Sequence, residues 1–91
     1  MNSDTIAERL RGLAGWSLSG NAIAKEFRFP DFDAAMAFVN AVADIAREED
    51  HHPDLEVGYS RVRVSYTTHS AGGLSERDFA SATRVEQLPG R

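Results

Sequence analysis

All three histidines of this 91-residue chain fall in one stretch, between Asp50 and Asp78. His51 and His52 are adjacent and stand before a proline, and His69 stands shortly before a pair of glycines. Imidazole titrates at about pH 6.5, so a cluster of imidazoles can hold one ring as an acid and another as a base near neutral pH. The residue types and their spacing therefore indicate general acid–base chemistry.

The segment between the histidines predicts a β-hairpin that brings them together. Apolar and polar residues alternate over residues 55–59 and again over residues 62–66, which is typical of two strands joined by a tight turn near Ser60. Residues equally far from the turn face each other in an antiparallel hairpin. A turn centred at Ser60 would therefore place the two adjacent histidines opposite Thr68 and His69.

Asp78 is expected to reach the same end of the hairpin. Ser75 and Asp78 have the spacing of a helix capping box, in which the acid accepts the N–H of the capping serine. This capping role is compatible with a catalytic one. We therefore take His51, His52, His69 and Asp78 as the candidate catalytic residues.

These residues also have other interpretations. A histidine can simply cap a helix or fill a surface corner, and three imidazoles with a carboxylate could bind zinc. His52 precedes Pro53, which favours an extended backbone and turns the adjacent rings in different directions. Divergent ligands suit one tetrahedral ion poorly, and no H-x-H or H-x-x-x-H pattern is present. We therefore expect no metal, and we expect no cofactor.

The composition is that of an ordinary soluble domain, with 42% hydrophobic and 26% charged residues. A net charge of -4 without a basic run argues against direct binding of nucleic acid. The absence of cysteine fits a reducing compartment, and no apolar run approaches the length of a membrane span. We expect a cytoplasmic protein with no membrane association. A single domain over residues 1–91 has a thin core, which predicts a homodimer or homotetramer.

Hydrophobic periodicity predicts the element order helix, two strands, helix, two strands, helix. Strands with one apolar face, combined with helices in this order, are typical of an α+β two-layer sandwich. We expect a four-stranded antiparallel sheet with the helices on one face, and the order of the strands stays open. The expected elements are a short first helix with Ile6, Leu10 and Leu13 on one face, strands near 16–18 and 23–29, a long helix from 32 to about 49, the hairpin described above and a last helix from 76 to about 88.

Two features of the helices lead to further expectations. Ser3 or Thr5 is expected to cap the first helix. In the long helix, Phe38, Ala41 and Ile45 widen the apolar stripe beyond what one sheet face needs. Either this helix lies deep in a small core, or it also packs on a second subunit.

Four motifs occur in a fixed order along the second half of the chain. They are DHHP at 50–53, Tyr59, Thr68-His69 and GLSERD at 73–78. Upstream of them lie a Gly15-Trp16 pair, an apolar strand pattern over 23–29 and a helix pattern over 32–39. In these motifs, their order and their spacing, nearly the whole chain resembles the pterin-4a-carbinolamine dehydratase family.

The resemblance implies dehydration of a 4a-hydroxytetrahydropterin to quinonoid dihydropterin, which recycles the pterin cofactor of aromatic amino acid hydroxylases. It implies that His51 and His69 are the acid–base candidates, and that Asp78 orients a histidine or contacts the ligand. The residues that it implies as substrate contacts are His52, Pro53, Thr68 and Ser70. Proteins similar to these dehydratases also serve as non-catalytic dimerisation, assembly or transcriptional cofactors, and the histidine set favours the enzyme.

The chain departs from the family pattern at two positions. Arg47 stands where members commonly carry a glutamate, although Glu48 beside it could take that role. Leu55 stands where a tryptophan is frequent, so one wall of the pocket is expected to be less aromatic.

Overall fold

The structure, a computed structural model, describes residues 1–90 and contains three α-helices, four strands and one short 3₁₀ helix. The elements are α1 (Ser3–Arg11), β1 (Ser17–Ser19), β2 (Ala22–Arg28), α2 (Phe32–Glu49), β3 (Asp54–Val57), β4 (Arg61–Tyr66), the 3₁₀ helix η1 (His69–Ala71) and α3 (Glu76–Glu86). This order confirms the predicted α+β class and the predicted succession of elements. Within residues 1–90, no helix is long and apolar enough to cross a membrane.

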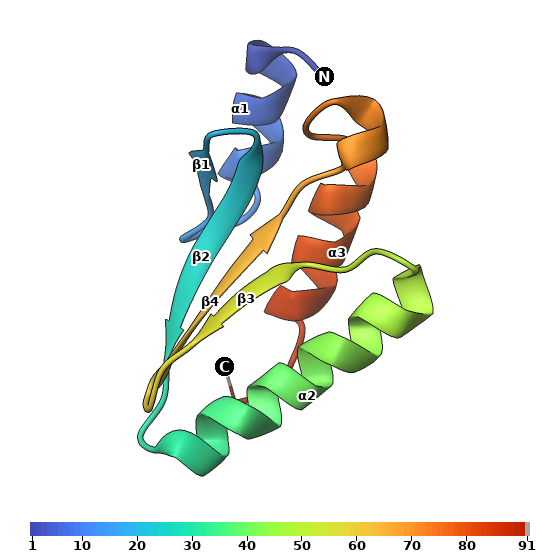
Figure 1. Cartoon of the computed structure of the whole chain (residues 1–91). Coiled ribbons are helices and arrows are strands. Elements are labelled where there is room, and N and C mark those ends of the chain that lie inside the picture. The colour runs from blue at the N-terminus through green and yellow to red at the C-terminus, as the bar shows by residue number, and fades with distance from the viewer. Residues whose placement is uncertain (91) are drawn as a thin grey trace.

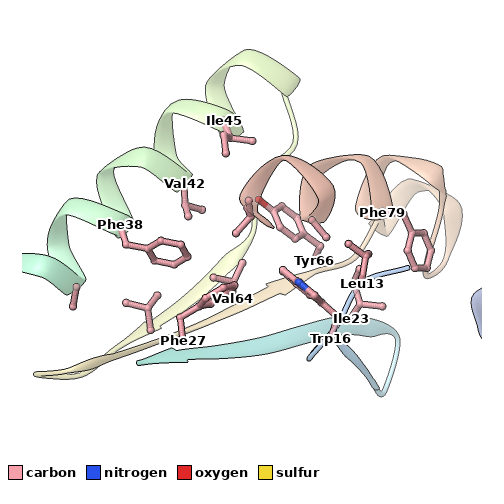
Figure 2. Close-up of a cluster of buried hydrophobic side chains, with 14 of the residues drawn as sticks. Leu13, Trp16, Ile23, Phe27, Phe38, Val42, Ile45, Val64, Tyr66 and Phe79 are labelled. Carbon is pink, nitrogen blue, oxygen red and sulfur yellow. The ribbon is translucent and has the colours of Figure 1, made fainter. Parts of the chain in front are cut away.

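The sheet has the strand order β1-β2-β4-β3, and every neighbouring pair is antiparallel. The central strands bury one face each, with Ile23 and Phe27 from β2 and Val62, Val64 and Tyr66 from β4. Figure 2 shows buried side chains filling the space between the sheet and the two longer helices, α2 and α3. In Figure 1, α1 lies beside β1 at the N-terminal end of the molecule. The core is therefore a single layer between sheet and helices.

The second hairpin differs from its predicted register by one residue. Leu55 pairs with Val64 and Val57 with Val62, so the turn is centred half a residue before Ser60. A turn centred at Ser60 would have set these apolar residues opposite polar ones. The observed register pairs apolar side chains with each other across the strands, which is the more stable arrangement. The prediction of the pairing was therefore wrong, whereas the hairpin itself is confirmed.

The two ends of α2 are both capped. At the start, the side chain of Asp31 accepts the N–H of Ala34 at 2.8 Å. At the end, Asp50 adopts the left-handed conformation with a φ of 50°, and the N–H of His51 donates to the carbonyl of Ala46 at 3.1 Å. This turn ends the helix and fixes the point from which the double histidine leaves it.

The buried face of α2 includes two of the three residues, Phe38 and Ile45, that were expected to widen the apolar stripe, whereas Ala41 is only half-buried. The buried face consists of Ala35, Phe38, Val42, Ile45 and Ala46. Phe38 packs on Phe27 with ring centroids 4.7 Å apart, so the wide stripe enters the core of this chain. Phe32, at the start of the helix, stays 45% exposed.

The remaining helix ends differ from the predicted ones. Asn2 caps α1, since its side chain accepts the N–H of Thr5 at 2.9 Å. Ser3, one of the expected caps, is already a helical residue. α3 ends at Glu86, before the predicted Leu88.

Candidate active site

Asp78 lies in the first turn of α3 and is completely buried. Its Oδ1 lies 2.6 Å from Nε2 of His51. Its Oδ2 accepts the hydroxyl of Thr68 at 2.8 Å and the N–H of Ser75 at 2.9 Å. The bond from Ser75 completes the predicted capping box. One carboxylate thus caps a helix and holds an imidazole.

His51 follows the last turn of α2, and only 8% of it is exposed. Because an ionised carboxylate can only accept, its bond to Asp78 assigns the hydrogen to Nε2 of the imidazole. Nδ1 is then the ring nitrogen left for other partners. The imidazole also stacks on the ring of Tyr66, with centroids 5.7 Å apart and planes inclined by 18°.

A surface cavity of about 320 Å³ brings the three histidines together. The residues that line it are Asp50, His51, His52, Thr67, Thr68, His69, Ser70 and Arg77. Of the residues implied as substrate contacts, His52, Thr68 and Ser70 line this cavity. Pro53 is half-buried and does not line it. Asp78 does not line it either, because it lies beneath His51.

The three imidazoles come from different elements and differ in exposure. His51 is buried, whereas His52 is exposed at the start of the path to β3. His69 is exposed and is the first residue of η1, which is separated from the end of β4 by two residues. The cavity therefore has one fixed imidazole and two that solvent or a ligand can reach.

Arg77 is a cavity residue that reasoning from the sequence missed. One nitrogen of its guanidinium, Nη2, donates to the carbonyl oxygens of Glu49 and Asp50. These carbonyls belong to the C-terminal end of α2, where the helix dipole favours a positive charge. The available signal was its place inside GLSERD, directly before Asp78, but a motif position does not reveal a contact with another helix.

The two departures from the family pattern lie outside the cavity. Arg47 pairs with Asp44 at 2.9 Å and is exposed, and Glu48 pairs with Arg84 at 2.5 Å. Neither residue lines the cavity. Leu55 packs against the hydrophobic core and does not form a cavity wall.

Near the site, the side chain whose pKa departs furthest from its ordinary value is Tyr66. Burial, followed by the negative charge of Glu49, raises the pKa of its phenol to about 12. Its side chain is fully buried, and its hydroxyl has no hydrogen-bond partner within residues 1–90. In the same part of the chain, no group of three or more His, Cys, Asp or Glu side chains has the arrangement of a metal site.

Comparison with known proteins identifies the family. The family model for pterin 4 alpha carbinolamine dehydratase matches residues 1–88. A relative from Nitrosospira multiformis, provisionally named a pterin-4-alpha-carbinolamine dehydratase, is 49% identical over 97% of this chain and 78% of its own length. A relative from Xanthomonas campestris with the same provisional name is 55% identical over 91% of this chain and 72% of its own length.

Two solved structures have a similar fold. A transcriptional coactivator/pterin dehydratase from Brucella melitensis superposes with a TM-score of 0.90 at 36% identity, over 96% of this chain and 95% of that one. A pterin dehydratase-like protein described as a RuBisCO assembly factor in the alpha-carboxysome superposes with a TM-score of 0.71 at 26% identity, over 84% and 90%. From the family model and these relatives, we conclude that the chain belongs to the pterin 4 alpha carbinolamine dehydratase family.

Proposed function

We propose that this chain is an enzyme that dehydrates 4a-hydroxytetrahydropterin to quinonoid dihydropterin by general acid–base catalysis with imidazoles. The observation that carries the proposal is the cavity shared by His51, His52 and His69, in which His51 is bound to the buried Asp78. Membership of the family and the names of the relatives support the reaction class.

The reaction needs two proton transfers at different atoms of the substrate. The C4a–O bond breaks, and the hydroxyl accepts a proton and leaves as water. The proton on N5 is removed, and the electron pair of the N–H bond forms the double bond between N5 and C4a. After this step the acid has lost a proton and the base has gained one, and the enzyme returns to its starting state when a proton passes from the base to the acid, directly or through solvent. Two positioned imidazoles are sufficient for this exchange.

The positions of the imidazoles suggest a division of roles. His51 has Nε2 held by Asp78, which leaves Nδ1 for proton exchange. His69 reaches the cavity from the other side of the hairpin, on η1. We assign the two proton transfers to these residues, and we assign binding of the pterin ring chiefly to His52, with Thr68 and Ser70 beside it.

The test is a stopped-flow measurement of the rate at which the pure protein dehydrates a 4a-hydroxytetrahydropterin. Replacing His51 or His69 with alanine should lower kcat by about 10²–10⁴. His52→Ala should mainly raise KM, which is the mark of lost binding. The proposal fails if the pure protein does not accelerate dehydration, or if the three folded variants all react at the parent rate.

Treatment with EDTA tests the metal-free form of the proposal. Activity should survive exhaustive chelation, because the proton transfers are assigned to imidazoles. A loss of activity that zinc restores would replace the acid–base proposal with a metal-assisted one.

A second candidate is a non-catalytic binding module on the same fold. The observation that favours it is the similarity to the structure described as a RuBisCO assembly factor. A module that acts through its helices or sheet edge does not need three imidazoles and a buried carboxylate in one place. The cavity therefore favours the enzyme, and absence of dehydration by the pure protein would favour the module.

A further inference from the structure

Tyr66 is the last residue of β4, and its ring stacks on the side of the His51 imidazole that faces the core. It is fully buried, and the two rings are close to parallel, with centroids 5.7 Å apart. The two residues that follow it, Thr67 and Thr68, line the cavity. Tyr66 thus belongs to the core but touches an imidazole of the candidate active site.

The hydrogen bond to Asp78 does not by itself fix the His51 ring. It holds one atom, Nε2, at 2.6 Å from Oδ1 and leaves the imidazole able to rotate about that contact. A flat aromatic surface packed against the ring removes this freedom, because rotation would push the imidazole into the tyrosine. Together the two contacts determine both the position of Nε2 and the plane of the ring, and hence the direction of Nδ1.

We propose that Tyr66 is a positioning residue, whose aromatic face holds the plane of the His51 imidazole so that Nδ1 points at the bound substrate. This proposal rests on the proposed function, because it assigns a proton transfer to His51. Tyr66 belongs to none of the DHHP, Thr68-His69 and GLSERD motifs, and it does not line the cavity.

The aromatic face carries the role, and the hydroxyl is not needed for it. No hydrogen-bond partner of the Tyr66 hydroxyl is present among residues 1–90, so this group cannot orient the imidazole through a bond to it. Phenylalanine keeps the ring and loses only the hydroxyl. The conservative variant should therefore preserve the function of the site, and a non-aromatic one should not.

Tyr66 also contacts Trp16, at a centroid distance of 6.2 Å, so its replacement will disturb the core in general. Val64 provides the matched control. It is fully buried on the same face of β4, two positions earlier, and lies outside the cavity. Val64→Ala therefore weakens core packing without removing the surface on which His51 rests.

The experiment compares Tyr66→Phe, Tyr66→Leu and Val64→Ala with the parent. Tyr66→Leu should lower kcat by about 10- to 100-fold with little change in KM, because a misdirected proton carrier impairs the chemical step more than binding. Tyr66→Phe should restore kcat to within about twofold of the parent, and Val64→Ala should lower stability but keep kcat. The proposal is overturned if Tyr66→Leu keeps the parent kcat, or if Val64→Ala loses as much kcat as Tyr66→Leu.

NMR of the imidazole protons provides a readout that does not depend on activity. A ring stacked on tyrosine experiences its ring current, so the His51 carbon-bound protons should be shifted upfield in the parent and in Tyr66→Phe. The shift should be lost in Tyr66→Leu or, if that variant does not fold, in Tyr66→Met. Absence of the shift in the parent overturns the proposal. If the shift is present but the pure parent does not dehydrate the pterin, the proposed function fails while the contact between the two rings stands.

Discussion

Asp78 shows how a single buried carboxylate links a helix end to an imidazole of the candidate active site. Three donors converge on it, from the backbone of Ser75, the hydroxyl of Thr68 and the ring of His51. A carboxylate that is buried away from solvent is stable only when hydrogen-bond donors satisfy its oxygens in this way. The pairing that α3 requires therefore also fixes which nitrogen of His51 carries the hydrogen.

We predict that Asp78→Asn changes the tautomer of His51. The amide oxygen can still accept from Ser75 and Thr68, which turns the amide NH₂ toward Nε2 of the imidazole. Two facing donors cannot bond, so the ring should move its hydrogen to Nδ1. The expected loss in kcat is about 10²–10⁴, with a loss of about 1–3 kcal/mol in the free energy of unfolding. Kinetics, urea unfolding and ¹⁵N chemical shifts of the ring measure the three effects.

Thr68→Val is the control for this prediction, because it removes one donor to the carboxylate and keeps the size of the side chain. The tautomer of His51 should remain as in the parent. Parent-like kcat and an unchanged tautomer in Asp78→Asn would show that Asp78 serves only the helix.

At the residue scale, the sequence identified the groups whose chemistry is intrinsic. His51 and His69 could be selected because few side chains exchange protons near neutral pH. Asp78 could be selected because its capping-box spacing from Ser75 places it at the same end of the hairpin. Arg77 and Tyr66 could not, because only contacts with residues distant in the sequence place them at the site. Nothing in a single sequence distinguishes a buried tyrosine beside an imidazole from any other core aromatic residue.

At the element scale, local patterns predicted the succession of helices and strands but not their arrangement. The limits of α2 follow from Asp31 at one end and from the chain reversal at Asp50 at the other. The strand order β1-β2-β4-β3 depends on which strand edges meet in space, and strand periodicity contains no such information. The register of β3 on β4 was missed because the turn was centred at Ser60, whereas pairing the apolar residues of the two strands with each other moves the centre half a residue earlier.

The interior of α3 contains an unpaired polar group that predicts a stabilising change. Ser81 is almost completely buried, and its hydroxyl has no hydrogen-bond partner within residues 1–90. Burying an unsatisfied hydroxyl costs about 1–3 kcal/mol. Ser81→Ala removes this cost and improves helix propensity, so we expect the melting temperature to rise by several degrees, measured by thermal unfolding.

Thr83→Ala in the same helix is the matched control. It gives the same gain in propensity, but its hydroxyl donates to the carbonyl of Phe79 at 2.7 Å, and that bond is lost. The melting temperature of Thr83→Ala should therefore stay below that of Ser81→Ala. A melting temperature of Ser81→Ala equal to or below that of the parent would mean that an internal water satisfies the Ser81 hydroxyl.

At the scale of the whole molecule, we predict a homo-oligomer, either a dimer or a tetramer. A chain of 91 residues buries only about 60–65% of its unfolded surface. Several large apolar residues also remain exposed, among them Leu18, Phe32 and Tyr59. Association would cover part of this surface. Light scattering at micromolar concentration should give two or four times the mass of one chain, and a mass of one chain alone would contradict the prediction.

The last prediction concerns stability in alkaline solution and depends on Tyr66. Burial and the charge of Glu49 raise the pKa of its phenol from about 10 to about 12. The folded state thus retains the phenolic proton over a range in which the unfolded chain loses it. The resulting stabilisation is complete below about pH 10 and is lost as the pH rises toward 12. A difference of two units corresponds to about 2–3 kcal/mol.

Urea unfolding between about pH 10 and pH 12 tests this prediction. The free energy of unfolding should fall less with rising pH in Tyr66→Phe than in the parent, and the difference should be about 2–3 kcal/mol. Tyr59→Phe, which removes the exposed tyrosine, should fall like the parent. If Tyr66→Phe loses stability as steeply as the parent, the folded protein does not protect the Tyr66 phenol from ionisation.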